Sequence, residues 1–216
     1  MNREWSELNK EMQRCLNREE TYGQGLEVLF QLREKLMDTL LEIREGRTRE
    51  AFDAMPYAGA DGYHSKTIAY SIWHVFRIED IVAHSLIRRD EEIFFEKGYK
   101  EKMHAPIVTT GNELAGQGIA KFSKQLDLEN LYRYALEVKE STEELLRRMP
   151  YRELKRKFSE EDKERLRASG CVSADENACW LIDYWCGKDI RGLIRMPFSR
   201  HWIMHIEASL RIAKKG

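Results

Sequence analysis

Two histidines near the end of the sequence have the spacing of metal ligands on a helix. His201 and His205 enclose the segment H-W-I-M-H. Positions four apart on an α-helix differ by about 40° around its axis, so both imidazoles leave one face, one turn apart. The apolar residues within about 60° of that face are Phe198, Ala208 and Ile212. The pair is therefore predicted to face inward, where imidazoles need hydrogen-bond partners or a shared ligand.

A third histidine is predicted to face inward from an earlier helix. His74 lies in the middle of a helical pattern over 65–88, and its face carries Thr67, Tyr70, Ser71, Ile78, Ile81 and Ser85. A single buried histidine is explained by a hydrogen bond to a Tyr or Ser hydroxyl. Three inward-facing histidines on two helices instead favour a divalent metal ion bound by His74, His201 and His205.

The neighbours of His74 have expected roles of their own. Tyr70 and Ser71 lie on its side of the helix and could orient a bound water. Glu79 falls about 140° around the helix from His74, too far to reach the ion, and is expected to anchor a neighbouring helix. The remaining histidines, predicted to be surface or loop residues, are His64, His84 and His104.

Other patterns of catalytic residues are absent from the sequence. It contains no G-x-S-x-G, P-loop, G-x-G-x-x-G, H-E-x-x-H or EF-hand motif. The Glu-x-x-His spacing of di-iron bundles does not occur at the three inward histidines. The four cysteines form no C-x-x-C pair and are expected to be reduced and buried. Imidazole ligands suit zinc, nickel, iron or copper, so the identity of the metal stays open.

The elements that must position these histidines are helices. Apolar residues recur at three- and four-residue spacing through most of the 216 residues, and only four are prolines. The pattern predicts an all-α fold, a helical bundle in a single domain over residues 1–216. The expected segments are a polar N-terminal helix within 1–20, helices over 25–45, 65–88, 91–102, 113–126, 127–148, 177–189 and 199–215, and a charged helical excursion over 151–169.

Several helix ends carry recognisable signals. The expected capping boxes are Thr110 to Glu113 and Ser173 to Glu176, and the expected single caps are Asp127 and Ser199. Met196-Pro197 is expected to break the chain before the last helix.

The bulk composition excludes several partners. The 36 basic and 37 acidic residues give a net charge of −1, so no global positive field attracts nucleic acid. No apolar run is long enough to span a membrane, and charged residues near Met1 do not resemble a signal peptide. We therefore expect a cytoplasmic protein with no nucleic-acid or membrane partner.

The sequence resembles the DinB-like (YfiT-like) superfamily. Two segments carry the resemblance, S-I-W-H-V-F-R-I-E-D over 71–80 and His201-x-x-x-His205, within a similarity that spans about 26–212. The stretches 91–118 and 151–168 depart from the family pattern. The resemblance implies a DinB-like four-helix bundle, here with additional short helices, that often forms a homodimer. It also implies a metal held by three histidines, which map onto His74, His201 and His205, with open positions for water or substrate.

The resemblance carries two hypotheses about function. Characterised relatives include thiol-dependent transferases and isomerases, which implies a metal-dependent enzyme, a thiol S-transferase or a hydrolase, acting on a small molecule with a low-molecular-weight thiol as partner. The alternative is a non-catalytic, stress-related helical bundle in which the metal is structural or absent.

Overall fold

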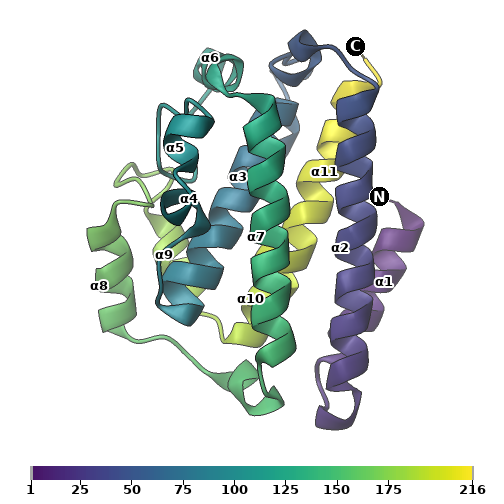
Figure 1. Ribbon diagram of the computed structural model, residues 1–216, viewed down its shortest axis with the longest axis vertical. Helices are drawn as coiled ribbons and strands as arrows, with labels where there is room; N and C mark the ends of the chain where they lie inside the picture. The colour runs from purple at the N-terminus through teal and green to yellow at the C-terminus, as the bar shows by residue number, and fades with distance from the viewer. Residues whose placement is uncertain (1, 216) are drawn as a thin grey trace.

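Four helices form the centre of the molecule. In the computed structural model, which describes residues 2–215, they run side by side (Figure 1). They are α2 (Tyr22–Glu45), α3 (Ile68–Asp80), α7 (Leu128–Arg148) and α11 (His201–Ala213). Helix α3 packs against α7 and α11, and α11 also packs against α2. No strand occurs within residues 2–215, so the prediction of an all-helical chain is confirmed for that range.

The expected polar N-terminal helix is α1 (Arg3–Cys15), which lies along the outside of α2. Asn2 caps it by accepting hydrogen bonds from the backbone N–H groups of Glu4 and Trp5. Its inner face buries Trp5, Met12 and Cys15, while the rest of the helix is polar. A narrow apolar stripe thus holds a mostly charged helix against the centre.

The helix that carries His74 begins later than the periodicity predicts. Thr67 ends the preceding loop, because its hydroxyl accepts the backbone N–H of Tyr70 at 3.0 Å and so caps α3. Beyond Asp80 the helix continues in π-helical form over Ile81–Arg88 and stops at Arg89, which adopts a left-handed conformation with φ of 61°.

The segment expected as one helix over 91–102 is two short helices, α4 (Ile93–Glu96) and α5 (Tyr99–Lys102). They are separated at Gly98, whose φ of 64° no helix interior allows. The capping box expected at Thr110 is wrong, because α6 (Gln117–Gln125) begins after Gly116. Thr110 instead donates its hydroxyl to the side chain of Asn112. The cap expected at Asp127 is confirmed by its hydrogen bond from the N–H of Asn130.

After α7 the chain folds into short elements against the lower half of α3. A 3₁₀ turn (Tyr151–Lys155) is followed by α8 (Glu160–Ser169), α9 (Trp180–Cys186) and α10 (Ile190–Arg195). The charged excursion expected over 151–169 is therefore a turn and one short helix, capped by Ser159. The capping box expected at Ser173 is wrong. Asp175 accepts the N–H of Asn177, and such a local turn competes with helix formation.

The junction before the last central helix is continuous rather than broken. Met196–Arg200 form a π-helical turn that leads directly into α11, and Pro197 lies in its first turn, where its missing N–H costs no hydrogen bond. Ser199 is not the cap that the sequence predicts, since its hydroxyl donates to the carbonyl of Ile194. Helix α11 therefore begins at His201, with its first metal-ligand candidate in the first turn.

No helix within residues 2–215 is both long enough and apolar enough to cross a membrane.

Candidate metal centre

His74 is held in a defined orientation halfway along α3. Its side chain is buried, and its Nδ1 lies 2.9 Å from the backbone carbonyl oxygen of Thr110. A carbonyl oxygen can only accept, so Nδ1 carries the proton and Nε2 keeps its lone pair. This is the arrangement that orients a metal-binding histidine, with one ring nitrogen bonded to a backbone carbonyl and the other free to bind an ion.

The Thr110 carbonyl belongs to a segment, residues 108–111, that is fastened to α3 along its length. Four α3 side chains donate to four successive carbonyls of this 108–111 strap. The pairs are Arg77 to Val108, Trp73 to Thr109, His74 to Thr110 and Tyr70 to Gly111, at 2.7 to 3.1 Å. The strap therefore fixes the acceptor that sets the tautomer of His74.

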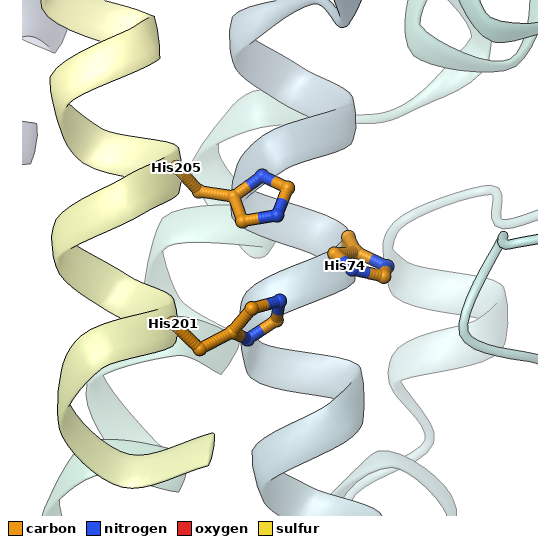
Figure 2. A group of neighbouring side chains, drawn as sticks. All are labelled: His74, His201 and His205. Carbon is orange, nitrogen blue, oxygen red and sulfur yellow. The ribbon is translucent and has the colours of Figure 1, made fainter. Parts of the chain in front are cut away.

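His201 and His205 face His74 from α11. The ring centroids of His201 and His205 are 4.7 Å apart, and each lies 4.9 Å from the centroid of His74. One ring nitrogen of each α11 histidine is turned toward His74 (Figure 2). The Nδ1 atoms of His201 and His205 are buried without a hydrogen-bond partner among the described residues. The close approach of the three buried rings indicates a shared ligand, because buried imidazoles need partners for their ring nitrogens.

The separation of the three rings suits a divalent ion. One nitrogen from each histidine can be chosen so that all three lie within 4.8 Å of one another. Zinc–imidazole bonds of about 2.0–2.1 Å in tetrahedral geometry place the ligand nitrogens about 3.3 Å apart. Binding of an ion would therefore draw the most widely separated of these nitrogens closer together.

Burial keeps all three imidazoles neutral. It lowers the pKa of His74 to about 4, with the nearby charge of Lys66 acting in the same direction and the Thr110 carbonyl opposing it. Burial, and then the neighbouring histidines, hold the pKa values of His201 and His205 well below 6.5. Neutral imidazole is the metal-binding form, so the cluster can bind an ion at neutral pH without first losing protons.

Glu79 anchors a neighbouring helix, as its position on α3 predicts. Its carboxylate accepts two hydrogen bonds from Arg33 of α2, at 2.6 and 3.0 Å, in a pair that is fully buried. It also accepts the indole N–H of Trp202 at 2.7 Å, next to His201 in sequence. Arg33 reaches α7 as well, through Glu143 at 3.1 Å. One buried ionic cluster thus joins all four central helices and fixes α11 beside α3.

The structure corrects the role expected for Tyr70 and the exposure expected for His84. The ring of Tyr70 stacks on His74 at 5.4 Å, but its hydroxyl donates to the carbonyl of Gly111 and so is not free to orient a water. The hydroxyl of Ser71 is buried and has no hydrogen-bond partner among residues 2–215. His84 is not a surface residue. It is buried, with its ring nitrogens 2.8 Å from Asp90 and 3.0 Å from Ser141.

The other two histidines lie outside the cluster. His104 is exposed, and His64 is half-buried beside Arg211. Of the cysteines, Cys179 is exposed rather than buried, and the other three are buried. No disulfide joins any of the four.

A cavity of about 200 Å³ reaches two of the three histidines. His74 and His201 form part of its wall, and the other lining residues come mainly from α9 and the turn before α11. Those residues are Ile78, Asn112, Trp180, Leu181, Tyr184, Trp185, Met196 and Pro197. A ligand of the ion could therefore enter from this side. The helical period could not reveal this wall, because α9 follows a long segment of turns over residues 170–179.

No protein-family model matches the sequence, and no curated protein matches it. We therefore infer the function of the centre from its residues.

Proposed function

We propose that this protein is a metal-dependent enzyme of the DinB-like superfamily, with one divalent ion bound by His74, His201 and His205. The observation that carries the proposal is the convergence of three buried, neutral imidazoles on one point. Zinc, nickel or iron would suit such a ligand set. The superfamily assignment rests on the resemblance of residues 71–80 and of the His201-x-x-x-His205 segment.

An open coordination position favours catalysis over a structural role. Structural zinc sites are closed by four protein ligands, whereas catalytic sites use three and leave a position for water or substrate. Among residues 2–215 the cluster offers three ligands, and the cavity beside His74 and His201 gives access to them. An ion held there would lower the pKa of a bound water or thiol towards neutrality and so supply a nucleophile.

The residues of the chain itself would position the reactants. The Thr110 carbonyl holds the ring of His74, and the apolar walls of the cavity keep bulk water from the reacting group. Asn112 also lines the cavity, and its side-chain oxygen accepts the hydroxyl of Thr110 at 2.8 Å. Its NH₂ group is then available to donate to a polar atom of the substrate. Thiol transfer and hydrolysis are the reaction classes that fit this arrangement.

Metal analysis tests the proposal. Protein purified without a histidine tag should contain about one equivalent of a divalent metal. His74→Ala, His201→Ala and His205→Ala should each lose most of it. His104→Ala, which changes an exposed histidine outside the cluster, should keep it. Equal metal content in wild type and the three cluster variants would place the ion elsewhere.

The non-catalytic alternative makes a different prediction for the same protein. A structural site would bind its ion just as well. After cobalt has replaced that ion, the absorption spectrum of the cobalt would not respond to added thiols or other small ligands. We further propose a cytoplasmic homodimer that binds no nucleic acid. Light scattering coupled to size-exclusion chromatography tests the homodimer, and a salt-dependent duplex binding assay tests the absence of nucleic-acid binding.

A further inference from the structure

Two aromatic residues of α9 stand exposed at the cavity beside the metal centre. Trp180 is 49% exposed and Tyr184 is 36% exposed, whereas Leu181 and Trp185 on the same short helix are buried. Trp180 and Tyr184 contact each other at a ring-centroid distance of 5.6 Å, nearly perpendicular, and all four residues line the cavity. The Lys188 ammonium lies 4.1 Å from the ring centroid of Tyr184, but both Trp180 and Tyr184 keep exposed apolar surface that a ligand in the cavity could bury.

The walls of the cavity define the chemistry of that ligand. None of the described residues that line it is an Asp, Glu, Lys or Arg, and Asn112 supplies the one amide. A multiply charged group would lose hydration there and would find only the amide of Asn112 as a polar partner among these walls. The ion behind His74 and His201 would be surrounded by neutral ligands and would keep its positive charge, which favours a single anionic or polarisable donor atom at that end.

The size of the cavity limits the body of the ligand. Its volume is about 200 Å³, and an engineered apolar cavity of about 150 Å³ in another protein accommodates benzene. The space therefore suits one aromatic ring or an apolar group of similar size, with a short link to the donor atom.

We infer that the substrate of this centre is a small molecule with a single-ring aromatic or comparably sized apolar body, which packs against Trp180 and Tyr184, and one thiol that binds the ion. This inference rests on the proposed function, because the thiol needs the metal. It adds to that function a preference for an apolar thiol over a multiply charged peptide thiol, because the carboxylates of a peptide thiol would lie against uncharged walls.

Cobalt-substituted protein provides the test. Phenylmethanethiol and 2-mercaptoethanol both carry the thiol on a CH₂ group, which bears an apolar phenyl ring in the first and a polar hydroxymethyl group in the second. Each is titrated under anaerobic conditions into cobalt protein, and the sulfur-to-cobalt charge-transfer band reports binding. We expect phenylmethanethiol to bind about 10- to 100-fold more tightly to wild type, because its ring is buried against the aromatic wall.

Variants locate the preference. The double variant Trp180→Ala, Tyr184→Ala should reduce the ratio of the two affinities to below about threefold while cobalt content stays the same. Both side chains are substantially exposed, so their removal should leave the fold intact. Phe95→Ala is the matched control, since Phe95 is 41% exposed and does not line the cavity. It should keep the wild-type ratio.

The outcomes distinguish an error in the metal centre from an error in the substrate. If cobalt does not bind, or binds equally well to His201→Ala, the metal centre is wrong and the inference falls with it. If cobalt binds at the histidines but the two thiols bind alike, or neither binds, only the inference about the substrate is wrong. A preference for phenylmethanethiol that survives the double variant would also overturn it, since the ring would then be recognised elsewhere.

Discussion

The substitution Gly111→Ala should weaken metal binding without touching a ligand. Gly111 has a φ of 79°, where an L-residue is strained, and a Cβ added there would lie 3.1 Å from Cε2 of Tyr70 and 3.6 Å from Cδ1 of Trp73. Both rings pack beneath the 108–111 strap and donate to its carbonyls. The contact with Tyr70 is too close, whereas the contact with Trp73 is an ordinary one, so the strap and the Tyr70 ring must separate by a few tenths of an ångström, and we expect the Thr110 carbonyl to move with the strap.

The expected magnitude follows from these contacts. The left-handed conformation alone costs an alanine about 1 kcal/mol. The close contact with Tyr70 adds about 1 kcal/mol of overpacking. Loss of a hydrogen bond that orients a ligand typically lowers metal affinity about 10- to 100-fold. We expect Gly111→Ala to lie near the lower end of that range, because the carbonyl is displaced rather than removed.

A second glycine separates backbone strain from the effect of the strap. Gly98 has a φ of 64°, but a Cβ there meets no atom within 4 Å. Gly98→Ala should lose about 1 kcal/mol of stability and bind metal like wild type. Urea unfolding of the metal-free proteins and zinc titration in competition with a chelator measure the two quantities. Equal zinc affinities for Gly111→Ala and Gly98→Ala would refute the role assigned to the strap.

Three further predictions concern stability. Because the pKa of His74 is lowered from 6.5 to about 4, the unfolded chain binds more protons in that interval, so the metal-free protein should lose stability as pH falls from about 6.5 to about 4. Each such histidine contributes up to about 1.4 kcal/mol per pH unit, and urea midpoints at several pH values should show a shallower dependence in His74→Leu than in wild type. Glu79→Ala leaves Arg33 buried without its two-bond partner and should cost about 3–5 kcal/mol, whereas Arg33→Met combined with Glu79→Gln should recover much of the loss in a double-mutant cycle. Asp127→Ala removes the cap of α7 and should lower the unfolding free energy by about 1 kcal/mol, while Asp127→Asn should retain most of it.

Helical periodicity was sufficient to place the three histidines and Glu79. A 100° step per residue orients every side chain on a straight helix, and α3 and α11 are regular at those positions. The same rule predicted the wrong exposure for His84, because the polar face of a helix is solvated only if no other element covers it. Asp90 and Ser141, from a turn and from α7, supply the partners that allow His84 to be buried.

The surroundings of the site were not predictable from local patterns. The 108–111 strap depends on side chains more than thirty residues earlier that donate to its carbonyls, and no sequence motif encodes such pairing. The same carbonyl interactions explain why the expected capping box at Thr110 does not start a helix. The aromatic wall depends on where α9 lies after the turns at 170–179, which are stabilised by local Asx-type hydrogen bonds rather than by helical periodicity.

X-ray absorption at the edge of the bound metal would show directly whether the three histidines bind it. We expect three imidazole nitrogens at about 2.0–2.1 Å for zinc, with one or two further light-atom ligands from water. We also expect that phenylmethanethiol adds a sulfur at about 2.3 Å and that the three-imidazole signature is lost in His201→Ala. A site with four protein ligands, or a spectrum unchanged in His201→Ala, would contradict the assignment of His74, His201 and His205 as an open metal centre.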